Sequence, residues 1–171
     1  MSNILVVDDE AIIAMQLEER LNAMGYTVSG IAASGEDAIE KARRLNPDLV
    51  LMDIVMPGRL NGIEAAKTVA EELDIPVVFV TSFADDATIA KAKLVGPYGY
   101  IVKPFNELEI KAGIEVALFR KTAERELRKG ATSADESRSH GKGGEEGESG
   151  TEYIDLPEIK TLLLKDIFTD I

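Results

Sequence analysis

Short runs of apolar residues alternate along this chain with longer segments in which apolar residues recur at helical spacing. Runs such as "LVLM" and "VVFV" are apolar throughout, which is typical of strands covered on both faces of a sheet. The predicted strands are residues 4–9, 26–34, 48–53, 75–82 and 98–104. The predicted helices follow these strands in turn, at residues 10–25, 35–47, 61–73, 84–96 and 106–130. The alternation predicts an α/β fold, a doubly wound five-stranded parallel sheet with helices on both faces.

The pattern changes near residue 129, where we expect this domain to end after an extended last helix. Residues 130–150 contain no apolar residue larger than alanine, which predicts a flexible, acidic, Gly/Ser-rich linker. Residues 151–171 regain a helical pattern and predict a short amphipathic helix. Its apolar face comprises Ile159, Leu162, Leu163 and Ile167. Two interpretations stay open: this helix packs on the domain, or it docks on a partner.

Composition narrows the range of functions. The net charge is −12, and no basic stripe is present, which argues against direct nucleic-acid binding and favours protein partners. No apolar run reaches the ~18 residues of a membrane-spanning helix. The N-terminus "MSNILVVDDE" does not resemble a secretory signal, so we expect a cytoplasmic protein. The absence of cysteine excludes disulfides and thiolate metal ligands.

Polar side chains end four of the five predicted strands. Asp8 and Asp9 follow the first strand, Asp53 the third, Thr81 the fourth and Lys103 the fifth. Because the carboxyl ends of parallel strands share one edge of a sheet, we expect these groups to form one site. Three neighbouring carboxylates repel one another, and an oxygen-preferring cation such as Mg²⁺ or Mn²⁺ relieves that repulsion. A carboxylate in such a site can accept a phosphoryl group as an aspartyl phosphate.

Four segments carry a resemblance to a known family. "LVVDDE", "LVLMDIVMP", "VVFVTS" and "YIVKPF" resemble, in order and spacing, the signature segments of response-regulator receiver domains in two-component signal transduction. The resemblance covers about residues 3–120 and implies a flavodoxin-like fold with strand order 2-1-3-4-5. It implies a phosphorelay role in which a histidine kinase phosphorylates Asp53. The chain would then be no enzyme beyond phosphoryl transfer to and from its own Asp53.

The same resemblance implies the ligands of the cation. Asp9 and Asp53 would bind Mg²⁺ together with the backbone carbonyl of Val55, and Asp8 would help through water. Lys103 would contact the phosphoryl group. The peptide bond between Lys103 and the following proline, Pro104, would be cis, a form that only X-Pro bonds adopt at low cost.

The resemblance also implies a switch made of Thr81 and Tyr100. A phosphoryl group on Asp53 would draw the Thr81 hydroxyl inward, and Tyr100 would turn into the space that is vacated. This change would alter the surface of the predicted fourth helix, fifth strand and fifth helix, where a protein target binds.

Two features depart from the commoner family pattern. The residues two positions after Asp53 and Thr81 are Val55 and Phe83, both apolar. In the family these positions flank the water that hydrolyses the phosphoaspartate, so we expect a long-lived phosphoryl group. The loop "GRLNG" at residues 58–62 is one residue longer than usual, and its effect does not follow from the sequence.

Rival phosphate-handling families fit less well. A haloacid-dehalogenase-type phosphatase requires Asp-x-Asp after the first strand, whereas Asp8 and Asp9 are adjacent. A flavodoxin needs a phosphate loop rich in hydroxyls and glycine, where this chain has "DDEA". A Walker loop is absent. The single histidine, His140, lies in the predicted linker, which excludes histidine-based acid–base catalysis at the site.

The output of the predicted receiver has two open alternatives. One alternative is a stand-alone receiver that binds a protein target or relays phosphate, because no helix-turn-helix pattern follows the receiver. The other is a receiver that forms a homodimer or regulates itself through its last helix and tail. The apolar residues of the last helix that would form the contact between two copies are Val116, Phe119, Ala123 and Leu127. The stretch 115–130 also resembles connectors that lead from some receivers into sensor domains.

Overall fold

The computed structural model of the chain describes residues 1–82 and 85–136. Five strands form one sheet: β1 (Asn3–Val7), β2 (Thr27–Ala32), β3 (Leu49–Asp53), β4 (Val77–Thr81) and β5 (Gly99–Val102). The helices are α1 (Ala11–Ala23), α2 (Gly35–Leu45), α3 (Gly62–Leu73), α4 (Asp86–Leu94) and α5 (Glu107–Glu136). The predicted helix at 151–171, most of the predicted linker and Phe83 lie outside the described residues.

All neighbouring strands are parallel, and their order is β2-β1-β3-β4-β5. The predicted fold class and strand order are therefore confirmed. In register, Val7 pairs with Met52, Met52 with Phe79, and Phe79 with Tyr100. The carboxyl ends of β1, β3, β4 and β5 consequently reach the same edge of the sheet.

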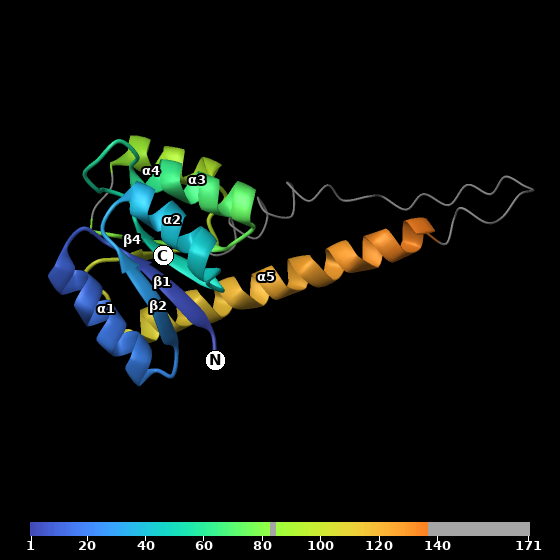
Figure 1. Cartoon of the computed structure of the whole chain (residues 1–171), viewed down its shortest axis with the longest axis horizontal. Helices are drawn as coiled ribbons and strands as arrows, with labels where there is room; N and C mark the ends of the chain where they lie inside the picture. Colours follow the sequence, from blue (N-terminus) through green and yellow to red (C-terminus); the bar gives the residue numbers. More distant parts are fainter. Residues whose placement is uncertain (83–84, 137–171) are drawn as a thin grey trace, which may run out of the picture. The chain divides into compact units, whose positions relative to one another are not determined.

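Alternate residues of the strands build two separate cores. Leu5, Val50 and Phe79 pack with residues of α2, α3 and α4, whereas Val6 and Leu51 pack with residues of α1 and α5. Figure 1 shows these two groups of helices covering opposite faces of the sheet. Because β3 and β4 are buried at every position, their sequences have no polar face, as the apolar runs predict.

The end of α5 differs from the prediction. The helix continues to Glu136, so the first residues of the predicted linker are helical, and the compact unit that contains the sheet spans Met1–Ser133. The stretch "GATSADE" contains no proline, and Gly130 does not adopt the positive φ that commonly ends a helix. A small, polar composition is thus compatible with helix here.

Polar contacts hold the middle of α5 against the end of α3. The buried Lys121 ammonium forms an ion pair with Asp74, the residue that ends α3 with φ 55°. The hydrogen bond from Lys121 lowers the pKa of Asp74, although burial opposes this effect. The Tyr98 hydroxyl before β5 donates to Glu124 of α5. None of the described helices is long and apolar enough to cross a membrane.

Candidate functional site

The carboxyl edge of the sheet collects the polar residues that the sequence singles out. Asp8 directly follows β1, Asp53 and Thr81 are the last residues of β3 and β4, and Lys103 directly follows β5. Asp8, Asp53 and Thr81 are buried, with exposed fractions of 2%, 5% and 7%. The fold thus brings these four predicted residues together.

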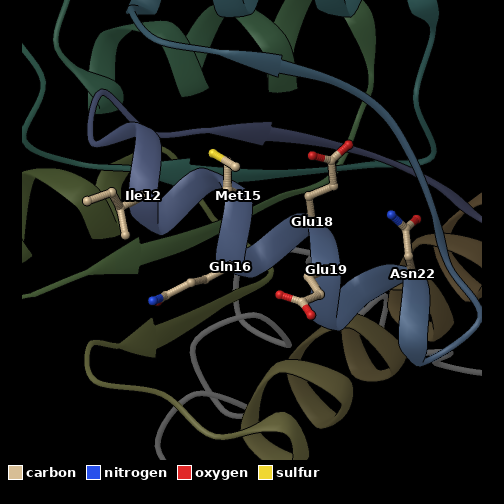
Figure 2. Close-up of a pocket in the computed structure, with 6 residues that line it drawn as sticks. All are labelled: Ile12, Met15, Gln16, Glu18, Glu19 and Asn22. Carbon is tan, nitrogen blue, oxygen red and sulfur yellow. The ribbon is translucent and has the colours of Figure 1, made fainter.

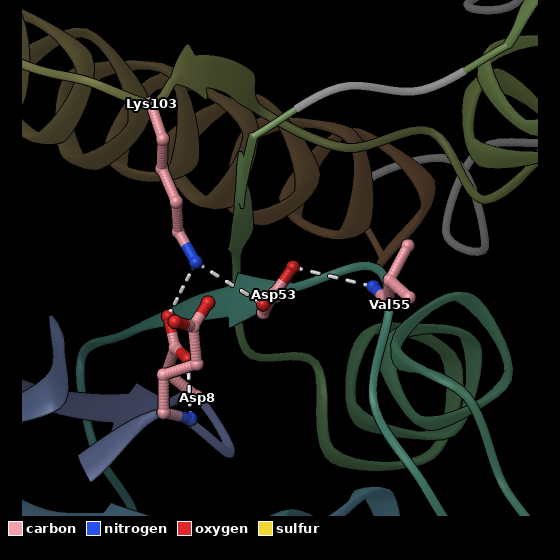
Figure 3. A network of polar contacts seen from close by, with 5 residues as sticks. Asp8, Asp53, Val55 and Lys103 are labelled. Atoms are coloured by element: carbon pink, nitrogen blue, oxygen red, sulfur yellow. Dashed lines mark hydrogen bonds and ion pairs between the residues drawn. The ribbon is translucent and has the colours of Figure 1, made fainter. Parts of the chain in front are cut away.

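Lys103 joins the two buried carboxylates. Its Nζ lies 2.7 Å from Asp8 Oδ2 and 3.2 Å from Asp53 Oδ2 (Figure 3). Asp53 Oδ1 accepts a hydrogen bond from the backbone N–H of Val55 at 3.2 Å. Asp8 Oδ1 accepts from the backbone N–H of Glu10 at 2.9 Å, which orients this carboxylate toward the lysine. Each oxygen of these two carboxylates therefore accepts one hydrogen bond.

Burial and charge act in opposite directions on these groups. Burial raises the pKa of Asp53, the ammonium of Lys103 lowers it in part, and the charge of Asp8 adds to the increase, so the net shift is upward. Burial by itself lowers the pKa of Lys103, but the ion pairs with Asp8 and Asp53 outweigh burial and raise it. Lys103 therefore stays charged, while ionised Asp53 is costly in this environment.

The site has the donor set of a divalent-cation site. Carboxylate oxygens of Asp8, Asp9 and Asp53 all lie within 4.8 Å of one another, and Asp9 is exposed to solvent. One ammonium cannot neutralise three carboxylates, so a negative charge remains at the mouth of the site. Oxygen ligands with one exposed side fit Mg²⁺, which retains several waters when bound.

Thr81 and Tyr100 both place a hydroxyl in the interior. Among the described residues, neither hydroxyl has a hydrogen-bond partner. The Tyr100 ring packs against Phe79, with 5.7 Å between ring centroids, and burial raises the Tyr100 pKa to about 12. The Tyr100 hydroxyl is thus already buried here, in the orientation that we expected to accompany phosphorylation.

The loop between β3 and α3 is fixed where α3 begins and at Arg59. A Cβ on Gly62 would lie 1.8 Å from the backbone oxygen of Asp53, so only glycine fits where α3 begins. Glu36 of α2 accepts a hydrogen bond from the backbone N–H of Arg59 at 3.1 Å. The longer "GRLNG" loop therefore rests against the start of α2. The sequence pattern did not single out Glu36. For Gly62, a glycine within the first turn of the helix predicted over residues 61–73 was the available signal.

Pro104, Val55 and Phe83 are the remaining predicted positions. The Lys103–Pro104 peptide bond is cis. The Val55 side chain is exposed. The position of Phe83 lies outside the described residues.

The outer face of α1 carries an open hollow near the site. Ile12 and Met15 expose apolar side chains there, and Glu18 and Glu19 add charge (Figure 2). Because α1 begins three residues after Asp8, a protein that approaches the carboxyl edge can also contact this face.

Comparison with known proteins places residues 4–115 in one family. These residues match the family model described as the response regulator receiver domain. The chain is 39% identical over 117 residues to the transcriptional regulatory protein PdtaR of Mycobacterium tuberculosis, covering 68% of this chain and 57% of that protein. It is 37% identical over 103 residues to the chemotaxis protein CheY of Thermotoga maritima, covering 60% and 85%. The chain thus spans little more than half the length of PdtaR.

Solved structures agree with this placement. The signal receiver domain of a modulated diguanylate cyclase from Desulfovibrio desulfuricans G20 is 36% identical with a TM-score of 0.70, covering 72% of this chain and 98% of that one. The N-terminal domain of a response regulator/sensory box/GGDEF three-domain protein from Carboxydothermus hydrogenoformans is 36% identical with a TM-score of 0.66, covering 71% and 98%.

Proposed function

Since this chain belongs to the response regulator receiver family, we propose that Asp53 accepts a phosphoryl group from a histidine kinase and thereby switches a protein-binding surface. The observation that carries the proposal is the position of Asp53: buried, bound by Lys103 and grouped with Asp8 and Asp9. Burial and the neighbouring charge of Asp8 raise the pKa of Asp53, and shifted pKa values of this kind cluster at functional sites.

The proposed reaction moves one phosphoryl group. An Asp53 carboxylate oxygen attacks phosphorus and forms a new P–O bond, while the bond between phosphorus and the donor nitrogen breaks. The donor imidazole leaves with the bonding electron pair. Lys103 Nζ, which already lies 3.2 Å from Asp53 Oδ2, binds the charged phosphoryl oxygens. In this proposal the chain catalyses only phosphoryl transfer to and from its own Asp53.

Asp8, Asp9 and Asp53 would hold Mg²⁺, with the Val55 carbonyl as a further candidate ligand. A bound cation would neutralise part of the negative charge on the phosphoryl oxygens. Thr81 would supply the other contact, because its buried hydroxyl lacks a partner among the described residues and can donate to the phosphoryl group.

Tyr100 would act as the second half of the switch. Its ring packs against Phe79, and its buried hydroxyl has no hydrogen-bond partner among the described residues, so no hydrogen bond holds it in this position. The two residues lie on neighbouring strands, where Thr81 pairs with Val102 and Phe79 with Tyr100. A movement of Thr81 would therefore also move β5, which lies next to α4 and α5.

The kinase would contact the carboxyl edge and the adjoining face of α1. Ile12 and Met15 are exposed to 72% and 64%, and apolar side chains of this kind commonly form the centre of a protein interface. This contact surface is tested by Met15→Glu, which should slow transfer from the kinase and leave phosphorylation by acetyl phosphate unchanged.

The function is tested by incubating the chain with acetyl phosphate and Mg²⁺ and measuring its intact mass. We expect the mass of one added phosphoryl group, its loss on treatment with hydroxylamine, and no addition to Asp53→Asn. The matched control Asp48→Asn, an exposed aspartate before β3, should behave like the wild type. Equal phosphorylation of wild type and Asp53→Asn would overturn the proposal.

The output is proposed in two forms. One is binding of a protein target to the α4–β5–α5 surface. The other is coupling through α5 to further parts of a regulator, which the similarity to the receiver of a sensory box/GGDEF protein favours. PdtaR is described as a transcriptional regulatory protein, so regulation of transcription is the broader role that relatives suggest.

A further inference from the structure

Arg20, near the C-terminal end of α1, contacts the segment that follows the site lysine. Its Nη1 donates a hydrogen bond to the backbone oxygen of Phe105 at 3.1 Å. The Cζ atom of the same guanidinium lies 5.6 Å from the centroid of the Phe105 ring, within the range of a cation–π contact. A planar cation with several donors makes both contacts at once, so Arg20 holds both the backbone and the ring of Phe105.

Phe105 follows Lys103 by two residues, in the short segment that leads from β5 into α5. At one end of this segment, the backbone N–H of Lys103 donates to the backbone oxygen of Thr81 at 2.8 Å. At the other end, the Asn106 side chain accepts a hydrogen bond from the first turn of α5 at 2.9 Å. Between these two points, the Phe105 carbonyl accepts its hydrogen bond from Arg20. The position of the Lys103 backbone therefore depends on α1 as well as on β4 and α5.

The Phe105 ring lies against the core that α1 and α5 share. It is half-buried and packs against the cluster that contains Leu17 of α1 and Ile110 of α5. Figure 1 shows both helices on this face of the sheet. Arg20 is half-buried too, so its hydrogen bond to Phe105 is partly shielded from water and electrostatically stronger than an exposed one.

Helix α1 also holds the carboxylate that pairs with the lysine. Asp8 Oδ1 accepts a hydrogen bond from the backbone N–H of Glu10, directly before α1 begins, at 2.9 Å. Asp8 Oδ2 binds Lys103 Nζ at 2.7 Å. About ten residues of helix, roughly 15 Å, separate Glu10 from Arg20. One helix thus fixes the aspartate at its N-terminal end and the lysine segment near its C-terminal end.

We propose that Arg20 is a positioning residue, which holds the Phe105 carbonyl so that Lys103 Nζ reaches both Asp8 and Asp53. The role rests on the proposed function, because Lys103 is the group that would bind the phosphoryl oxygens. The distance of 3.2 Å to Asp53 Oδ2 is already at the long end for a hydrogen bond. A displacement of about 1 Å at such a site can cost up to about 10² in rate.

A purely structural role for Arg20 is the alternative. In that role Arg20 would only join α1 to the start of α5, and its loss would have the same effect whether or not Lys103 is present. A positioning residue acts through the lysine and has nothing to position once the ammonium is removed. Because residues that act together are not additive, combining substitutions at the two positions separates these roles.

Mg²⁺ binding by the unphosphorylated full chain, measured by calorimetry, is the first test. Arg20→Met removes the charge and the donors. Lys103 should then leave the carboxylates, and Mg²⁺ should bind about threefold more tightly because the ammonium repels the cation less. Arg20→Lys keeps a cation and a donor and should stay near the wild type. The control is Arg44→Met, an exposed arginine on α2, which should change nothing.

The rate of phosphorylation by acetyl phosphate at saturating Mg²⁺ is the second test. We expect Arg20→Met to slow the reaction by about tenfold and Arg20→Lys to recover most of the rate. In a Lys103→Met background, Arg20→Met should change the rate and the Mg²⁺ affinity by less than about twofold. Unchanged Mg²⁺ binding by Arg20→Met alone, or an equal loss of rate in both backgrounds, would overturn the positioning role.

Two further measurements keep these results interpretable. Circular dichroism and urea unfolding check that each variant is folded, and Arg20→Gln, also a good helix former without a charge, replaces Arg20→Met if that variant is not. A wild-type chain that acetyl phosphate does not phosphorylate would overturn the proposed function. The Mg²⁺ measurements would still show whether Arg20 holds Lys103 at the carboxylates.

Discussion

Lys103 Nζ lies 3.2 Å from Asp53 Oδ2, so an ammonium after β5 is paired with a carboxylate at the end of β3. The same nitrogen binds Asp8 at 2.7 Å. The lysine therefore partly neutralises the site from which a divalent cation would take its ligands. Its charge also lies where a phosphoryl group on Asp53 would need stabilisation. These two roles have opposite consequences when the lysine is removed.

Replacing Lys103 with methionine should tighten Mg²⁺ binding and slow phosphorylation. Without the ammonium, three carboxylates attract the cation more strongly, and we expect about tenfold tighter binding by calorimetry, equivalent to about 1.4 kcal/mol. Phosphorylation by acetyl phosphate should slow by a factor on the order of 10², the usual loss for one preorganised donor. Lys93→Met on the exposed side of α4 is the control. Weaker Mg²⁺ binding by Lys103→Met would contradict this account of the charges.

Replacing Thr81 with valine should separate stability from phosphorylation. The Thr81 hydroxyl is buried and has no described partner, so a methyl group of similar size should leave stability unchanged or raise it by about 1 kcal/mol. The phosphorylated form should lose the hydrogen bond and the switch at Tyr100. Urea unfolding and the phosphorylation rate measure the two effects. A large loss of stability without phosphate would show that the hydroxyl is paired in the unmodified chain.

Gly62→Ala should damage the site through the backbone. The added Cβ would lie 1.8 Å from the Asp53 backbone oxygen, so either α3 or the end of β3 must move. We expect a loss of about 2–4 kcal/mol in urea unfolding and reduced phosphorylation. Gly113→Ala on α5 is the matched control, because its Cβ meets only the flexible end of Ile101 at 3.3 Å. That variant should be neutral or more stable, since alanine favours helix over glycine.

Asp74→Asn should destabilise the chain in a pH-dependent way. The pKa of Asp74 is lowered in the fold from its usual 3.8, chiefly by Lys121, so its contribution is present above the usual value. This contribution is lost as pH falls through the lowered pKa, because the folded state then takes up the proton. We expect a loss of about 1 kcal/mol at neutral pH, modest because Asp74 is half exposed, and a smaller loss in acid. The control is Glu71→Gln, an exposed glutamate on α3. A loss of stability that does not depend on pH, or that equals the loss in this control, would contradict the ion-pair explanation.

Val55→Asn should shorten the lifetime of the phosphoryl group. Val55 is exposed to 63% beside Asp53, where an apolar side chain cannot orient an attacking water. An amide can hold that water, so we expect faster loss of phosphate, by roughly tenfold. The double variant Val55→Asn, Phe83→Glu should be faster still. A wild-type lifetime no longer than that of the double variant would remove the basis for this hypothesis.

The sequence allowed the sheet to be predicted because β3 and β4 are buried on both faces and tolerate no polar residue before their ends. The burial of these strands also made Asp53 and Thr81 stand out, because a polar residue at the end of a fully apolar strand indicates a functional site at that edge of the sheet. Glu36 escaped notice because its contact with the backbone of Arg59 depends on the path of a loop. The end of α5 was placed too early because a small, polar composition was taken for a linker.

The central claim is that Asp53 is the phosphoryl acceptor. Its most direct test is reduction of the phosphorylated chain with borohydride, which converts an aspartyl phosphate to homoserine, followed by peptide mapping. We predict homoserine at position 53 alone, dependent on Mg²⁺ and on the phosphoryl donor. Homoserine at Asp8 or Asp9 with Asp53 unmodified would contradict the account.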